Sequence, residues 1–252
     1  MVLCDVVRAR SIASGALAVL EKGISLQDKD SSKQCVKALY VASQATDFRV
    51  RLANSTLPTS LVKVSFPKEN VERYEYAMRS LCNTAYDKEA RPFLQTAEFV
   101  KGIIDLIKLN MRPPAAEYFA VTLCVLTFGY SNPYELIQFG IVEALQILAE
   151  KSDSLIVIRA VVNTLRALAT ECSAAIPQLA TAEVMSILKK ASVAEAAVTD
   201  SKNEEPMYNV AAIIFIFSQY DEARVSTAIP VILDILCAIR KYTSCACLLA
   251  GI

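Results

Sequence analysis

The sequence repeats an apolar pattern every 42 residues. Leucine recurs at this interval inside four similar stretches, at Leu39, Leu81, Leu123 and Leu165. A small residue or a threonine precedes each of these leucines, and a fifth, looser copy follows near Ile214. A repeat of this length is typical of proteins that stack small helical units, because one unit alone cannot bury its apolar face.

The residues inside each copy predict helices. A segment that opens with Gly140 has looser counterparts in the other copies, and Asn132 followed by Pro133 is typical of a helix start. No strand pattern competes, so we expect each unit to contain a short first helix, a middle helix and a longer third helix. In the fourth copy the apolar residues follow helical spacing at Ile158, Val161, Val162, Leu165, Leu168 and Ala169.

This pattern resembles the armadillo-repeat family over nearly the whole chain. The family's third helix reads A-x-x-[AS]-L-x-N-[LI], and Ala77, Ser80, Leu81 and Asn83 match it. Its middle helix opens with glycine, as the segment at Gly140 does. The resemblance implies an all-α fold, a right-handed α-solenoid of about five three-helix repeats. An irregular HEAT array is the structural alternative.

We expect one superhelical domain over residues 1–252, with a partial repeat at 1–26 and an insertion at 191–206. Either the middle helix continues through the start of this insertion before a solvated loop, or the insertion is a protruding contact loop. The final residues, 246–252, are apolar and end inside a repeat, whereas a terminal repeat needs a polar outer face. We therefore expect the chain to be part of a longer protein.

Composition excludes several kinds of catalytic and cofactor site. Histidine is absent, so the chain offers no imidazole base and no histidine ligand for zinc. The 6 glycines form no phosphate-binding loop. Of the 8 cysteines, Cys245 and Cys247 form the only tight pair, which supplies too few ligands for a structural zinc site. We expect no catalytic residue, cofactor or metal, and hence no enzyme.

Charge and hydropathy indicate where the protein works. The 26 basic and 26 acidic residues cancel, which removes the electrostatic attraction that nucleic-acid binding requires. The longest apolar stretches fall short of the about 20 residues that span a bilayer. The residues from Met1 onward do not read as a secretory signal. We therefore expect a cytoplasmic protein that neither binds nucleic acid nor inserts into a membrane.

The resemblance also implies where a partner binds. In armadillo proteins the third helices line a concave surface, and the peptide binders among them carry a ladder of asparagines there, with tryptophans four residues earlier. Only Asn83 keeps that ladder in this chain, which contains no tryptophan. Binding of a nuclear-localisation peptide in the importin-alpha manner is therefore not expected. The asparagine positions of the ladder hold Val41, Asn83, Val125, Ala167 and Ile216.

Charged and polar residues of alternating sign replace this ladder. Glu75 and Arg79 are four residues apart and are expected to pair on one helix face. Such a face is either a polar groove for a folded or helical partner, or a solvated surface whose charges compensate each other. The residues predicted to contact a partner are Lys33, Lys37, Glu75, Arg79, Asn83, Glu117, Arg159 and Asn163.

These observations predict a non-enzymatic scaffold that binds another protein along its third helices. The alternative is a chaperone-like domain that holds client proteins, similar to the UCS-type myosin chaperones. That alternative depends on the resemblance in fold alone. As part of an enzyme, the chain is expected to supply only a regulatory arm.

Overall fold

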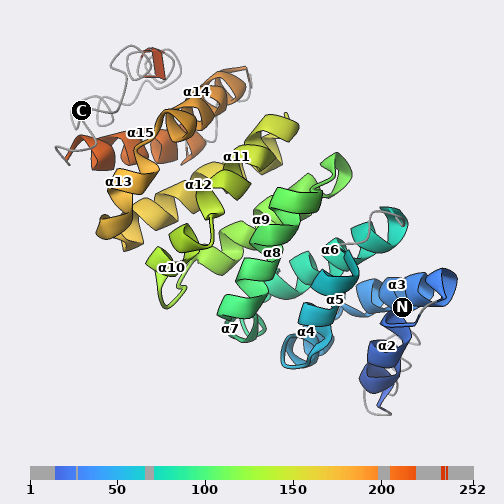
Figure 1. The fold of residues 1–252 in the computed structure, drawn as a ribbon. Coiled ribbons are helices and arrows are strands. Elements are labelled where there is room, and N and C mark those ends of the chain that lie inside the picture. Colours follow the sequence, from blue (N-terminus) through green and yellow to red (C-terminus); the bar gives the residue numbers. More distant parts are fainter. Residues whose placement is uncertain are drawn as a thin grey trace. The chain divides into compact units, whose positions relative to one another are not determined.

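The computed structural model describes residues 15–26, 28–65, 71–197 and 205–219, together with 234, 235 and 237. All regular structure within these residues is helical. The order of first, middle and third helices predicted from the repeat is present (Figure 1). The third helices are α3 (Lys29–Ala42), α6 (Val71–Tyr86), α9 (Ala116–Thr127), α12 (Leu155–Glu171) and α15 (Glu205–Ser218).

The other helices precede these third helices in each repeat. Two short 3₁₀ turns, η1 (Pro113–Ala115) and η2 (Ser173–Ala175), complete the described elements. The middle helices are α2 (Ala16–Ile24), α5 (Leu57–Ser65), α8 (Ala97–Asn110), α11 (Ile141–Lys151) and α14 (Ala182–Ala196). The first helices are α4 (Thr46–Ala53), α7 (Arg91–Leu94), α10 (Pro133–Gln138) and α13 (Ile176–Leu179).

The residues that define the repeat lie in the core. Leu39, Leu81 and Leu123 are fully buried, Leu165 is 1% exposed, and Ile214 is 4% exposed. The apolar residues predicted to share the buried face of α12 are buried as well. Burial of these side chains removes apolar surface from water, which is the main favourable contribution to folding.

The residue before each central leucine is a buried hydroxyl in the middle copies. The hydroxyls of Ser80, Thr122 and Thr164 donate to the backbone carbonyl four residues earlier, at 2.9, 2.6 and 2.7 Å. A buried hydroxyl needs such a partner, and a preceding helical turn supplies one without any other residue. A small polar side chain therefore fits beside the buried leucine.

Four of the five middle helices that the structure describes begin in one of two ways. Gly15 and Gly140 precede α2 and α11 with φ of 77° and 83°, a left-handed conformation that favours glycine. Thr96 and Thr181 precede α8 and α14 in extended conformation, and their hydroxyls accept from backbone N–H groups three residues later. Both arrangements start the helix, but only the second adds a side-chain cap.

The chain groups into two compact units, residues 1–126 and residues 127–252. In the first unit α3 packs between α2 and α6, and α5 packs against α6 and α8. In the second unit α12 packs against α11, α14 and α15. The third helices α3 and α12 therefore each pack against more than one neighbouring helix.

The helix α14 covers the first part of the sequence insertion. It has 15 residues and ends at Ala196, whereas α11, at the same place in the preceding repeat, has 11. The helix thus reaches into the insertion, although α8 in an earlier repeat is nearly as long, with 14 residues. Residues 198–204 lie outside the described residues, as do residues 1–14, the Cys245–Cys247 pair and the apolar segment 246–252. Within the described part of the chain, no helix has the length and hydropathy needed to cross a membrane.

Candidate protein-binding surface

Aromatic and cationic side chains meet on the third helices of the first unit. The rings of Tyr40 on α3 and Tyr76 on α6 stack with their centroids 5.7 Å apart. The guanidinium of Arg79 lies 5.7 Å from the Tyr40 ring and 5.3 Å from the ring of Tyr118 on α9. The ammonium of Lys37 lies 5.8 Å from the Tyr76 ring. We call these five residues the tyrosine–arginine cluster; it connects three successive third helices.

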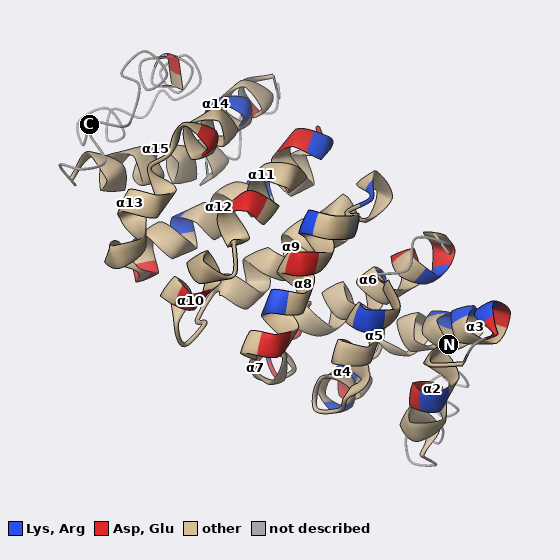
Figure 2. Cartoon of the chain, in the orientation of Figure 1, with Lys and Arg blue, Asp and Glu red and all other residues tan. Residues whose placement is uncertain are grey.

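Acidic residues partly neutralise this cluster. Glu75 pairs with Arg79 at 2.7 Å, as their spacing predicted. At the start of the same helices Lys33 on α3 pairs with Glu72 on α6 at 3.0 Å, and that contact raises the pKa of Lys33. Figure 2 shows basic and acidic residues interspersed along the helices. The surface is therefore mixed in sign.

Burial and exposure differ within the cluster. Lys37 is exposed, while Tyr40, Tyr76, Arg79 and Tyr118 are half-buried, so each of these four presents part of its surface to solvent. Burial raises the pKa of Tyr118, so its hydroxyl stays protonated at neutral pH. A neutral phenol beside a guanidinium can donate and accept hydrogen bonds with a partner.

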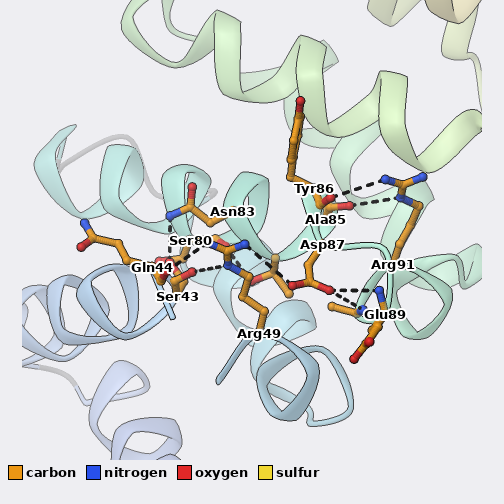
Figure 3. Close-up of polar contacts among 12 residues, drawn as sticks. Ser43, Gln44, Arg49, Ser80, Asn83, Ala85, Tyr86, Asp87, Glu89 and Arg91 are labelled. Atoms are coloured by element: carbon orange, nitrogen blue, oxygen red, sulfur yellow. Dashed lines mark hydrogen bonds and ion pairs between the residues drawn. The ribbon is translucent and has the colours of Figure 1, made fainter. Parts of the chain in front are cut away.

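Asn83 forms a hydrogen bond within the chain. Its amide nitrogen donates to the Ser43 hydroxyl at 3.0 Å, and Ser43 lies at the end of α3 (Figure 3). The one asparagine that matches the family's ladder thus connects two neighbouring third helices.

Two arginines cover the carboxyl ends of α3 and α6. Arg49 on α4 donates through Nε and Nη2 to the carbonyls of Ser43 and Gln44, at 2.7 and 3.0 Å. Arg91 on α7 donates in the same way to Ala85 and Tyr86, at 3.2 and 3.5 Å (Figure 3). The sequence analysis did not single out these arginines, although they stand one repeat apart.

Asp87 contacts both Arg49 and the backbone of the turn that precedes Arg91. Its Oδ1 accepts from the backbone N–H groups of Glu89 and Ala90, at 3.0 and 3.2 Å. Its Oδ2 lies 3.7 Å from Arg49 Nη1. The carboxylate therefore fixes the turn between α6 and α7 and adds a charge contact to the first arginine.

In the second unit, predicted surface residues surround a pocket. Arg159 on α12 donates through Nε and Nη2 to both carboxylate oxygens of Glu195 on α14, at 2.6 and 2.9 Å. Asn163 accepts from the Asn209 amide on α15 at 2.6 Å. These side chains line a pocket of about 400 Å³, its open mouth included.

The structure thus places the predicted surface residues in different surroundings. It brings Lys37 and Arg79 together around tyrosines, and it brings Arg159 and Asn163 together at the pocket. Glu117 is half-buried on α9 beside Tyr118. Within the described residues, no group of three or more acidic residues or cysteines is placed to hold a metal ion.

Sequence reasoning did not find the partners of these residues. The rings of Tyr40, Tyr76 and Tyr118 come from three different helices, so spacing within one helix does not predict that they meet around Arg79. The 42-residue interval between Tyr76 and Tyr118 was a usable signal, since it places both rings at one position of successive third helices. Glu195 lies in the insertion, near the end of α14, and contacts Arg159 on another helix, which spacing within one helix does not predict.

Comparisons with known proteins identify the fold. No family model and no curated protein matches the chain. A designed armadillo repeat protein superposes with a TM-score of 0.61 at 18% identity, over 89% of this chain and 98% of that one. A second designed armadillo repeat protein, solved in complex with the peptide (KR)4, gives 0.59 at 15% identity, over 92% and 94%. An engineered protein gives 0.59 at 17% identity, over 90% and 98%. The predicted fold class, an all-α solenoid of armadillo type, is confirmed.

Proposed function

We propose that this chain is a non-enzymatic scaffold that binds a partner protein along its third helices. The tyrosine–arginine cluster is the observation that carries the proposal. Tyrosine and arginine are enriched among the residues that contribute most to protein–protein affinity. Here the third helices hold them in place, so little side-chain freedom remains to be lost on binding.

The charges of this surface favour a partner of mixed polarity. Glu75 neutralises Arg79 within the cluster, and Lys33 pairs with Glu72 beside it. A strongly basic or acidic peptide would have to compete with these internal pairs. A folded or helical partner that offers apolar area to the rings and single charges to the rim fits better.

The mode of binding differs from that of an asparagine ladder. The designed relative that was solved with (KR)4 shows that the fold accommodates a peptide. In this chain tryptophan is absent, and Asn83 already donates to Ser43. The tyrosine rings of the cluster contact the partner in this proposal, in place of the carboxamides of an asparagine ladder.

The test is affinity capture from a cell extract with quantitative mass spectrometry. We compare the wild-type chain with a Lys37→Glu/Arg79→Glu variant, and both with a Lys63→Glu/Lys101→Glu control. The control makes the same change of charge at exposed lysines of the middle helices α5 and α8. A partner of the third-helix face should be depleted about tenfold or more by the first variant and retained by the control.

Thermal melts establish that all three proteins remain folded. Equal capture by both double variants would contradict the proposed surface. If the captured protein aggregates on its own and an equimolar amount of this chain prevents that, the client-holding alternative replaces the scaffold. The capture experiment tests which surface binds the partner, and the aggregation experiment tests whether the chain acts as a scaffold or holds clients.

A further inference from the structure

The pocket of the second unit has an apolar wall and a polar end. Ile158 and Val162 of α12, Ala191 of α14 and Pro206 of α15 form its apolar part. The side chains of Asn163 and Asn209 lie in the same lining. Residues of three helices line this partly open pocket, which suits a group that enters from one side, as a side chain does.

The paired carboxamides leave one donor and one acceptor unused. Asn209 is 2% exposed, and its amide nitrogen is taken by the Asn163 oxygen at 2.6 Å. Among the described residues, the Asn209 oxygen and the Asn163 nitrogen have no hydrogen-bond partner. An acceptor of this kind in the wall of a pocket is free to accept a hydrogen bond from a ligand group that donates to it.

The pocket carries no net charge at its polar end. Both oxygens of Glu195 accept from Arg159, and the carboxylate side chain is only 6% exposed. This bidentate contact neutralises the only acid and the only base in the described lining. A charged ligand would gain no unpaired opposite charge there, so a neutral group is favoured.

We propose that this pocket binds the side-chain carboxamide of a glutamine or asparagine on the partner protein. A primary amide offers one acceptor and two donors, which match the Asn163 nitrogen and the Asn209 oxygen. Its methylene stem packs on the four apolar residues. The proposal rests on the proposed function as a protein-binding chain, and it specifies which partner residue the second unit recognises.

A main-chain peptide group has the same chemistry. A main-chain group is attached to the rest of its chain at both ends, however, and so fits a continuous groove better than a single pocket lined by eight residues. The experiment therefore includes a probe that carries main-chain amides only.

The test follows the side-chain amide signals of Asn163 and Asn209 by NMR in the ¹⁵N-labelled full chain. Three probes are titrated separately: N-acetyl-glutamine methylamide, N-acetyl-glutamate methylamide and N-acetyl-alanine methylamide. The glutamine probe should shift both signals and saturate at a concentration on the order of millimolar, because so small a ligand contributes few contacts. The glutamate and alanine probes should leave the signals unchanged.

Two variants and one control locate the effect. Asn163→Ala is followed through Asn209, Asn209→Leu is followed through Asn163, and each should weaken binding of the glutamine probe about tenfold or more. Asn163 is half-buried, so Asn163→Ala is expected to fold. It tests binding at the pocket by itself if Asn209→Leu proves unstable. The control Asn83→Ala removes a carboxamide from the first unit and should leave the titration unchanged.

Several results would overturn the proposal. Equal shifts with the alanine probe would show that main-chain amides suffice. Equal shifts with the glutamate probe would show that a neutral head group is not selected. No shift with any probe would remove the pocket as a binding site, while the capture experiment on the first unit would still decide the proposed function by itself.

Discussion

Burial of single side chains has consequences for pH dependence, and Tyr74 is the clearest case. It is 2% exposed, its ring lies 5.9 Å from that of Phe119, and its hydroxyl accepts from the Arg112 backbone N–H at 3.3 Å. Burial raises the pKa of Tyr74 to about 12, because the apolar surroundings disfavour the phenolate. The folded state therefore keeps the proton at a pH at which the unfolded chain has released it.

We predict that the free energy of unfolding falls as the pH rises from about 10, the ordinary tyrosine pKa, to about 12. The contribution of Tyr74 to the free energy of unfolding is fully present below pH 10, because Tyr74 is then protonated in both the folded and the unfolded state. Tyr74→Phe has no proton to release, so the variant should lose less stability over this interval. Chemical denaturation at a series of pH values measures the difference.

Tyr86→Phe is the control for this experiment. Tyr86 is 66% exposed, so its replacement removes a hydroxyl from the surface and leaves the buried phenol of Tyr74 in place. A residual fall is expected in Tyr74→Phe, because burial also raises the pKa of Tyr130 to about 12. Identical profiles for wild type and Tyr74→Phe would show that Tyr74 does not titrate differently in the two states.

At the residue scale, sequence predicts contacts within a helix better than contacts between helices. The pair of Glu75 and Arg79 follows from spacing alone, because residues four apart share a helix face. The two rings that flank Arg79 lie on other helices, and their approach depends on how those helices are rotated. For the same reason the partner of Arg159 could not be read from the sequence.

At the scale of elements, the arginine caps make a specific prediction. Arg49 satisfies two carbonyls at the end of α3, and its side chain is 23% exposed. Arg49→Met keeps most of the aliphatic stem and removes the donors, so the two carbonyls lose their charged partner. We expect the free energy of unfolding to fall by about 1–2 kcal/mol in urea denaturation.

Arg51→Met on the same helix is the matched control. Arg51 is exposed, and its replacement should change stability by less than about 0.5 kcal/mol. Equal effects of the two substitutions would mean that the loss of a positive charge, and not the loss of the cap, determines stability.

Helix order could be predicted from sequence, whereas the way each helix begins could be predicted only in part. Gly140 opens α11 in a left-handed conformation, as glycine does when a residue with a side chain would be strained. Asn132 occupies the predicted cap position of α10 but makes no side-chain hydrogen bond there. Thr96 and Thr181 do cap their helices, at places where the sequence has no glycine.

At the scale of the whole molecule, the repeat made the fold predictable and left the binding chemistry undetermined. The leucines such as Leu81 and Leu165 recur because every unit must bury the same face. The residues of the tyrosine–arginine cluster and of the pocket follow no such rule; Arg79 is replaced by Val121 one repeat later. The proposed recognition depends on these departures from the repeat, which a periodic pattern cannot specify.

Repeat architecture also determines how far a local defect spreads. Stability in such proteins is approximately a sum of unit stabilities and contacts between neighbours. Leu81 is fully buried in α6, which packs against α3, α4, α5 and α7 in the first unit. Leu81→Ala should therefore destabilise these helices by about 2–5 kcal/mol.

Hydrogen exchange followed by mass spectrometry measures that spread. We expect peptides from α3, α5 and α6 to exchange at least about tenfold faster in Leu81→Ala, while peptides from α12 and α14 change little, because sites without shared partners act independently. Leu109→Ala is the control, since Leu109 is 69% exposed on α8 and its truncation opens no cavity. Uniform acceleration along the whole chain would instead mean that the two units unfold as one cooperative body, and the nearest-neighbour description would fail for this protein.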